Sequence, residues 1–141
     1  MANNMVHLAY VSQATHPFSE KELFELIDRS QMNNKKANIT GILVYNSGHF
    51  LQLLEGDEKL VSQLGETIAK DPRHKDMTIF FQASTPEIIF RDWYMAYKNL
   101  SEYNAGLRGK ISNLIDKAAQ NPKLTSKDEF LQILRFMRQE L

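Results

Sequence analysis

The sequence predicts an α+β fold, a β-α-β-β-α-β-β sandwich followed by two C-terminal helices. Segments with alternating apolar and polar residues, typical of strands, are interspersed with two segments of helical periodicity. A turn sequence joins two of the apolar runs as a hairpin. The length of 141 residues is close to the roughly 150 residues usual for one domain, so two full-sized domains are excluded.

The first two elements are a strand and a helix. Residues alternate from Met5 to Ser12, which places Val6, Leu8 and Tyr10 on one face of a strand. Ser19 and Glu22 form a capping box that opens a helix. Helical spacing then continues to about Asn33 or Asn34, and the residues that share one side are Leu23, Leu26, Ile27 and Ser30.

A hairpin and a second helix follow. Apolar runs from Ile39 to Tyr45 and from Phe50 to Glu55 flank Asn46-Ser47-Gly48, a turn that tolerates positive φ, so we expect two antiparallel strands. Asp57 can cap the next helix, which must end before Pro72. Its expected apolar stripe consists of Leu60, Val61, Leu64 and Ile68.

The remaining chain predicts two more strands and two more helices. Met77 to Ala83 alternates, and in a fifth strand Trp93, Met95 and Tyr97 alternate with their neighbours up to Lys98. Helical spacing returns from Asn99 to Asn121, although Gly106 and Gly109 each cost about 1 kcal/mol. Either Thr125 with Asp128 or Ser126 with Glu129 can cap the last helix. Its apolar arc is wide and comprises Phe130, Leu131, Ile133, Leu134, Phe136, Met137 and Leu141.

Two strand-helix-strand units that share a hairpin define the split-βαβ, or ferredoxin-like, arrangement. Each unit crosses over right-handedly to a parallel neighbouring strand, so both helices cover one face of the sheet. We expect residues 1–98 to form this domain and residues 99–141 to form a helical extension, the first helix of which leans on the sheet.

Composition excludes several classes of function. Lys plus Arg (17) balances Asp plus Glu (17), so no net field attracts nucleic acid or an acidic membrane surface. There is no cysteine, and the four histidines show no metal-ligand spacing. No secretory signal is recognisable, and no stretch approaches the ~20 apolar residues that span a bilayer. We expect a soluble, cytoplasmic protein that binds neither metal, membrane nor nucleic acid.

Two polar residues occupy strand positions at which alternation predicts apolar ones. Gln52 lies between Phe50 and Leu54 on one face, and Tyr10 shares a face with Leu8. An unpaired buried polar group costs about 1 to 3 kcal/mol, so each side chain must bond another residue, the backbone or a ligand. A Tyr–Gln hydrogen bond in the core is the simpler interpretation.

The first helix strengthens the ligand interpretation. Ser30 and Asn34 continue the face opened by Leu23 and Ile27, so an amide points toward the space between helix and sheet, while Asn33 can be a frayed helix end. Groups that both donate and accept, framed by apolar residues of two helices, suit a flat heterocycle such as a flavin ring. The residues of this predicted site are Tyr10, Asn34 and Gln52, framed by Leu26, Ile27 and Ile68.

The rest of the ligand is less constrained by the sequence. No glycine-rich phosphate-binding loop is present, so a dinucleotide would be held by its ring rather than by its phosphates. Arg73 and His74 follow Pro72, where a cation can face the ring edge or a phosphate. The alternative for both residues is a solvated turn.

Six ordered segments are similar to one protein family. The runs HLAYVS, SQMNN, ITGILVY, FLQLLEG, DPRH and DWYM, in this order and spacing, resemble the BLUF domain, the blue-light receptor module that uses flavin. The resemblance covers about residues 5–98. It implies the ferredoxin-like sandwich, FAD held non-covalently between the two helices, and a photoreceptor without enzymatic activity.

At matching positions the resemblance implies individual roles. Tyr10 is the light-driven electron and proton donor, Gln52 is the switching amide beside flavin N5 and the C4 carbonyl, and Asn34 holds the C4 carbonyl and N3 edge. Trp93 and Met95 match a variable pair, either of which can lie near Gln52. Further positions at or near the flavin are Ser30, Asn33, Arg73 and His74, and the ring is sandwiched by Leu26 and Ile68.

The signal is expected to leave through a partner. Roughly 40 residues beyond the matched region cannot hold a cyclase or phosphodiesterase domain. We expect a separate effector or regulatory protein, or a homo-oligomer that rearranges. The expected route runs along strand five, which carries Trp93 and Met95, into the helix with Gly106 and Gly109. The last helix then presents a stripe of Phe130, Leu134, Met137 and Leu141.

Two other functions fit the same fold class. A ferredoxin-like enzyme or small-molecule-binding module needs a phosphate cradle or a histidine paired with a carboxylate at fixed spacing. An RNA-binding domain needs an exposed aromatic motif and a basic field. The sequence contains neither set of features. It leaves open the identity of the partner, the oligomeric state and the choice between FAD and FMN.

Overall fold

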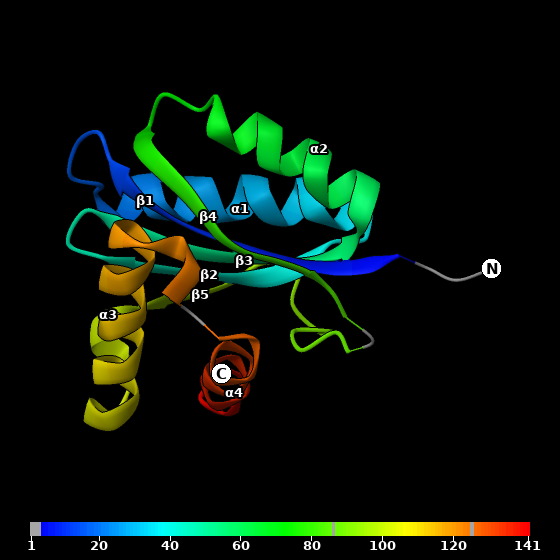
Figure 1. Ribbon diagram of the computed structural model, residues 1–141. Coiled ribbons are helices and arrows are strands. Elements are labelled where there is room, and N and C mark those ends of the chain that lie inside the picture. Colours follow the sequence, from blue (N-terminus) through cyan, green and yellow to red (C-terminus); the bar gives the residue numbers. More distant parts are fainter. Residues whose placement is uncertain (1–3, 86, 125) are drawn as a thin grey trace.

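The computed structural model describes residues 4–85, 87–124 and 126–141, and over these residues five strands form one sheet. The strands are β1 (Met5–Ala14), β2 (Thr40–Asn46), β3 (His49–Asp57), β4 (His74–Ser84) and β5 (Ala96–Asn99). The helices are α1 (Glu20–Ala37), α2 (Glu58–Ala69), α3 (Ala105–Gln120) and α4 (Lys127–Gln139), with single 3-10 turns at Leu100–Glu102 and Pro122–Leu124. Figure 1 shows α1 and α2 on one face of the sheet and α3 and α4 on the other. The predicted fold class is confirmed.

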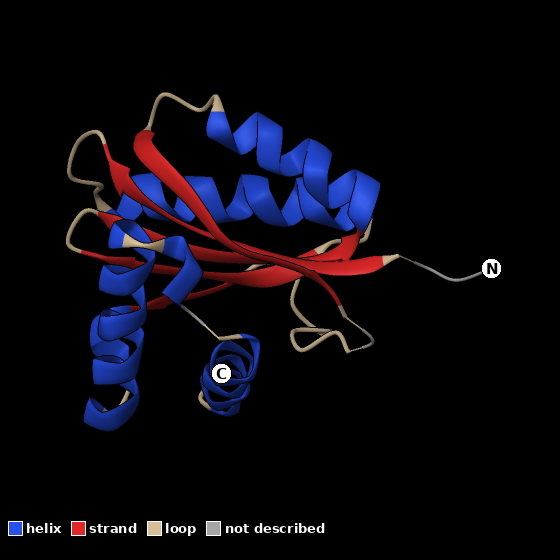
Figure 2. Ribbon diagram, viewed as in Figure 1, coloured by secondary structure: helices blue, strands red, loops and turns tan. Residues whose placement is uncertain are grey.

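The strand order in the sheet is β4-β1-β3-β2-β5 (Figure 2). β1 pairs antiparallel with both β3 and β4, β2 pairs antiparallel with β3, and β5 pairs parallel with β2. The strands joined by α1 are therefore parallel, but β3 lies between them, and β1 likewise separates β3 from β4. The expectation of parallel neighbours is wrong in this respect, because β3 lies inside the first crossover and β1 lies inside the second.

Local signals account for most element boundaries. The capping box at Ser19 and Glu22 is present, with both hydrogen bonds at 3.2 Å. The β2–β3 turn has φ of +46° at Ser47 and +89° at Gly48, as the turn sequence predicts. α1 runs one turn beyond the predicted end, because Asn38 at φ +54° is the left-handed cap.

The fifth strand is shorter than predicted. The ladder with β2 begins at Ala96, so Trp93 and Met95 precede β5. The Trp93 N–H donates to the Phe90 carbonyl at 3.0 Å, and the Trp93 carbonyl accepts from the Gly41 N–H at 3.1 Å. Residues 90–93 therefore form a turn instead of pairing with β2. The alternation of side chains along the sequence does not distinguish these two arrangements.

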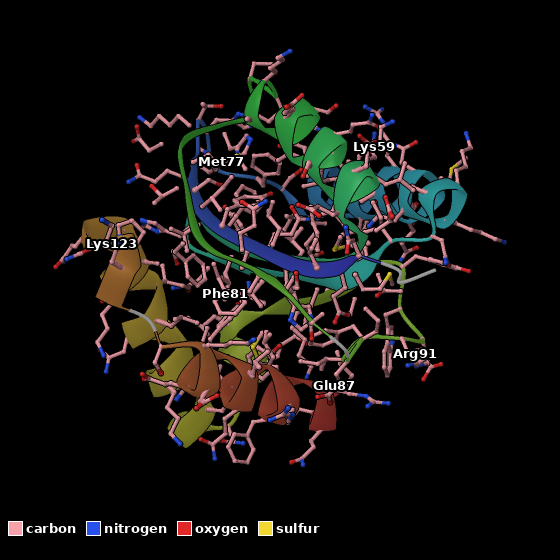
Figure 3. All side chains as sticks on the ribbon, turned by 45° about the vertical axis from the view of Figure 1, so that its right-hand side comes forward. Lys59, Met77, Phe81, Glu87, Arg91 and Lys123 are labelled. Carbon is pink, nitrogen blue, oxygen red and sulfur yellow. The ribbon has the colours of Figure 1, made fainter. Side chains whose placement is uncertain are left out.

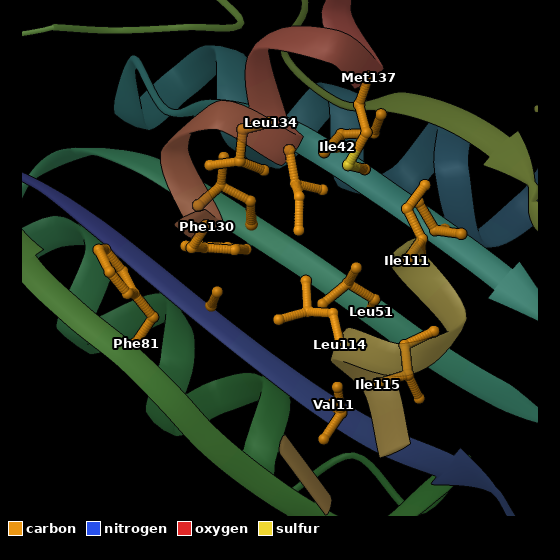
Figure 4. Packing of buried hydrophobic residues seen from close by; sticks show 14 of the residues in the cluster. Val11, Ile42, Leu51, Phe81, Ile111, Leu114, Ile115, Phe130, Leu134 and Met137 are labelled. Atoms are coloured by element: carbon orange, nitrogen blue, oxygen red, sulfur yellow. The ribbon is translucent and has the colours of Figure 1, made fainter. Parts of the chain in front are cut away.

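Two apolar cores lie on opposite faces of the sheet. The core under α1 and α2 includes Leu8, Leu23, Ile27, Leu54 and Val61. The core under α3 and α4 is larger and includes Val11, Leu51, Ile111, Leu114 and Phe130 (Figure 4). Because the second sheet face is apolar, α3 and α4 must cover it to keep it from water.

This packing corrects two predicted helix surfaces. Phe130, Leu134 and Met137 are each at most 1% exposed and face the sheet, so α4 does not present them as a free stripe. Leu141, the fourth member of that stripe, is 39% exposed, and so is Leu60 of the predicted α2 stripe.

The last helix, α4, has an N-terminal cap and an ion pair to the segment between β4 and β5. Ser126 caps α4 by accepting the Glu129 N–H at 3.2 Å, while the alternative cap at Thr125 lies outside the described residues. Arg135 of α4 pairs at 2.8 Å with Glu87, which lies between β4 and β5 (Figure 3). Across the described ranges, no helix is both long enough and apolar enough to cross a membrane.

Candidate functional site

A pocket of about 210 Å³ opens between α1, α2 and the sheet. β1 and β3 contribute its polar floor, the two helices its walls, and the turn after α2 part of its rim. All nine residues predicted to hold a cofactor line it: Tyr10, Leu26, Ser30, Asn33, Asn34, Gln52, Ile68, Arg73 and His74. Ile27 does not line the pocket and packs in the neighbouring core instead.

The floor is a chain of hydrogen-bonded side chains. Tyr10 and Gln52 are opposite one another in the β1–β3 ladder and are 4% and 5% exposed. The Tyr10 hydroxyl donates to Gln52 Oε1, and Gln52 Nε2 donates to Met95 Sδ at 3.5 Å. The Tyr–Gln hydrogen bond expected in a closed core is therefore present, but it lies at the floor of the pocket.

Burial also keeps the Tyr10 phenol protonated. It raises the pKa of the Tyr10 phenol well above its ordinary value of 10.0, and the Asp71 carboxylate adds a smaller effect in the same direction. The phenol is therefore neutral and keeps the proton that it donates to Gln52.

The structure separates the two members of the variable pair. Met95 is 1% exposed and belongs to the core beneath α1 and α2, where it contacts Gln52. Trp93 is half-buried and packs against the core on the opposite face. Neither residue lines the pocket itself, so Met95 reaches the site only through the Gln52 amide.

The inner face of α1 ties the pocket to the residues before β5. Asn34 is 2% exposed, and its Nδ2 donates to the Tyr94 carbonyl at 2.6 Å. Gln31 Nε2 donates to the Met95 carbonyl at 3.1 Å. The second N–H and the Oδ1 of Asn34 form no hydrogen bond with described residues, which leaves a donor and an acceptor at the pocket.

The walls are apolar. Leu26 of α1 and Ile68 of α2 are both half-buried and line the pocket from the two helices. Sequence reasoning missed further lining residues; among them Leu64 lies one turn before Ile68, and Thr67 lies one turn after Leu64, so both were accessible from helical spacing. The others missed are Phe18, Arg29, Leu43, Phe50 and Asp71.

The rim carries an ion pair that the sequence did not predict. Arg73 Nε donates to both carboxylate oxygens of Asp71 at 3.0 Å. The Arg73 guanidinium holds the pKa of the Asp71 carboxyl below its ordinary value. Arg73 is therefore not a free cation, whereas Arg29, which also lines the pocket, forms no ion pair with described residues.

His74 also has defined partners rather than a place in a solvated turn. Its Nε2 donates to the Ile68 carbonyl at 2.5 Å, and its Nδ1 contacts the Ser12 hydroxyl at 2.9 Å. The ring thus connects the end of α2 to β1 at the edge of the pocket.

This arrangement fits a flat heterocycle. Apolar side chains from two helices can enclose the faces of a ring, and the amides of Asn34 and Gln52 can pair with donors and acceptors along its edge. A phenol hydrogen-bonded to one of these amides is the oxidisable group beside such a ring.

Comparisons with known proteins agree with this geometry. The family described as BLUF, sensors of blue-light using FAD, matches residues 5–96, more than half of the chain. The photoactivated adenylate cyclase subunit alpha of Euglena gracilis is 40% identical over 86 residues, which are 61% of this chain and 8% of the cyclase subunit. The blue light- and temperature-regulated antirepressor BluF of Escherichia coli is 30% identical over 128 residues, 91% of this chain and 31% of the antirepressor.

Solved structures extend the likeness to the C-terminal helices. The dark-state structure of the BLUF protein BlrB has a TM-score of 0.79 at 26% identity and covers 99% of this chain and 98% of its own. The photo-activated state of BlsA has a TM-score of 0.77 at 26% identity, with 95% and 94% covered. The chain belongs to the BLUF family of flavin-binding blue-light sensors.

Proposed function

We propose that the chain binds FAD in the pocket between α1 and α2, and that Tyr10 and Gln52 form the photochemical switch. The observation that carries this proposal is the hydrogen-bonded series of Tyr10, Gln52 and Met95, which begins at the floor of a pocket with apolar walls. The family description names FAD as the flavin.

The ring-binding roles follow from the contacts of each side chain. Leu26 and Ile68 enclose the ring faces, and the free donor and acceptor of Asn34 pair with its carbonyl and imide edge. Ser30 and Asn33 add polar contacts from the same helix, while His74 with Arg73 closes the rim. Arg29 is the cation available for a phosphate, because Arg73 is neutralised by Asp71.

The switch requires two properties of the floor. A bound flavin would supply absorption of blue light and an acceptor for one electron and one proton. Tyr10 gives up one electron and its hydroxyl proton and then recovers both, so no product is released. While the phenol is oxidised its O–H no longer donates to Gln52, and the amide is free to exchange its donor and acceptor ends. A hydrogen bond moved onto the ring carbonyl shifts the absorption to longer wavelength.

The output is proposed to leave through the C-terminal helices. Light-dependent movement at Gln52 reaches Met95, and β5 leads from there to residues 99–141, which act as the output and oligomerisation region beside the sensor region of residues 1–98. The relatives include a cyclase subunit and an antirepressor, and this chain matches only 8% and 31% of their lengths. We infer that this chain is itself no enzyme and signals to a separate effector protein or a second copy.

The decisive experiment combines purification with two substitutions. The purified protein should be yellow, release FAD rather than FMN on denaturation, and show a reversible red shift under blue light. Tyr10→Phe and Gln52→Leu should each retain flavin, because the ring enclosure is unchanged, and lose the red shift. A folded, colourless protein that FAD cannot reconstitute would refute the proposal, and a full shift in Tyr10→Phe would refute the donor assignment.

The output route has its own test. Hydrogen exchange in dark and light should differ within residues 99–141 if these helices loosen or move. Unchanged protection throughout residues 93–141, with an intact red shift, would remove β5 and the C-terminal helices as the route.

A further inference from the structure

A buried carboxylate on the far face of the sheet is not used by the proposed photochemistry. Glu55 of β3 is 1% exposed, and its two oxygens accept hydrogen bonds from four groups. Two are backbone N–H groups, Ile89 at 2.6 Å and Phe90 at 2.7 Å. The others are His7 Nε2 at 2.8 Å and the Thr40 hydroxyl at 3.1 Å. Every lone-pair site of the carboxylate therefore has a donor.

The two backbone donors lie between β4 and β5, in residues 87–95, which end at Met95 and are called the connecting segment below. Hydrogen bonds to an ionised, buried carboxylate are stronger than those between neutral groups. Figure 3 shows this segment, with Glu87 labelled, beside α4 and below the sheet. Glu55 thus fastens the first half of the segment to the far face of the sheet.

Gln52 and Glu55 are three residues apart on β3, and their side chains point to opposite faces of the sheet. Gln52 contacts Met95 on the pocket face, while Glu55 holds Ile89 and Phe90 on the other. A closed path therefore runs from the Gln52 amide along β3 to Glu55, through Phe90 along the connecting segment to Met95, and back to Gln52.

One further backbone bond, from the Gly41 N–H of β2 to the Trp93 carbonyl at 3.1 Å, holds the segment, and its remaining polar contacts are weaker. The carbonyls of Tyr94 and Met95 each accept one side-chain amide from α1, from Asn34 and from Gln31, and Gln31 is exposed. The ion pair between Glu87 and Arg135 is about half exposed at both side chains, where such pairs contribute little. Among the described side chains that bond this segment, only Glu55 combines charge, full burial and hydrogen bonds to two backbone groups.

We propose that Glu55 is a positioning residue that sets the contact between Met95 and the Gln52 amide, and thereby the lifetime of the light state. His7 and Thr40 complete the carboxylate's hydrogen bonds. Loosening the segment lowers the barrier to the return of the amide, because a mobile Met95 Sδ can accept the Gln52 N–H before the amide has turned back fully. This inference rests on the proposed function of Tyr10 and Gln52.

The test uses the flavin-loaded full chain and the rate of dark recovery after blue light. Glu55→Gln keeps the side-chain shape but places an NH2 group against one of the two backbone donors, Ile89 or Phe90, which bond different oxygens of Glu55. Recovery should accelerate at least about threefold, with an unchanged flavin content. Glu87→Gln is the matched control, since it removes a carboxylate from the same segment without touching those two amides, and its recovery should stay at the wild-type rate.

A double-substitution cycle separates positioning from general loosening. In a Met95→Leu background, which removes the sulfur acceptor, Glu55→Gln should no longer change the recovery rate. An unchanged or slower recovery in Glu55→Gln, an equal acceleration in Glu87→Gln, or the same acceleration without the Met95 sulfur would overturn the inference.

A measurement on the wild-type protein covers the case in which Glu55→Gln does not fold. The Ile89 and Phe90 amides should resist hydrogen exchange in the dark better than the Glu87 amide, which donates to the neutral Thr85 hydroxyl at 3.1 Å rather than to a buried carboxylate. Equal exchange of the three would overturn the inference. A wild type without flavin or red shift would instead refute the proposed function, so the two failures are distinguishable.

Discussion

Asn34→Ala tests whether the buried amide of α1 supports both the fold and the ligand. Asn34 is 2% exposed, and its Nδ2 bonds the Tyr94 carbonyl at 2.6 Å. Removing the amide deprives that partly buried carbonyl of its partner, which costs about 0.5 to 1.5 kcal/mol. Ala favours the helix by up to about 0.7 kcal/mol over Asn, which offsets part of this loss.

Asn33→Ala is the matched control for this prediction. Asn33 is exposed, directly precedes Asn34 in the same helix and also lines the pocket. Both substitutions gain the same helix propensity, so their difference isolates the buried hydrogen bond. In urea unfolding of the flavin-free protein followed by circular dichroism, Asn34→Ala should be less stable than Asn33→Ala by about 0.5 to 1.5 kcal/mol.

The flavin provides a second measurement on the same pair. Loss of one hydrogen bond to the ring edge should weaken FAD binding by Asn34→Ala about two- to tenfold, measured by titration of the flavin-free protein. Equal unfolding free energies for the two variants would refute the structural role of Asn34. Equal flavin affinities would refute its place at the ring.

Two further predictions concern backbone space and pH. Gly41→Ala should prevent stable folding, because a Cβ there would lie 2.0 Å from the Leu53 carbonyl oxygen. Gly109→Ala, whose Cβ would have nothing within 4 Å, should raise the unfolding free energy by about 0.5 to 1 kcal/mol, because Ala has the higher helix propensity. Thermal unfolding of both variants checks this pair. Arg73 lowers the pKa of Asp71, so this pair stabilises the fold above pH ~4 and the stabilisation is lost as pH falls through the lowered pKa. Asp71→Asn should therefore be less stable than wild type at pH 7 and equally stable near pH 2 in urea unfolding; a constant difference would contradict the linkage.

The three polar residues at the centre of the pocket could be predicted from the sequence, because each occupies a position at which the local pattern of side chains predicts an apolar residue. Tyr10 and Gln52 interrupt apolar faces of two strands, and Asn34 interrupts the apolar face of a helix. Periodicity places such residues toward a core, and an unpaired polar group there is costly, so a shared site followed from local information alone. The order of helices and strands, the hairpin turn and the caps at Ser19 and Asp57 were determined in the same way.

The tertiary structure decided which distant groups become partners. The contact of Met95 with Gln52, rather than of Trp93, depends on a turn held by Phe90 and Gly41, which leaves no periodic signal. The burial of the apolar side of α4 depends on whether a sheet face is free to receive it. The pairing of Glu55 with Ile89 and Phe90 joins backbone groups 34 and 35 residues away. Local sequence determines which groups face inward, but the positions of remote backbone donors, and hence the contacts that hold Met95 against the switch, exist only once the chain has packed.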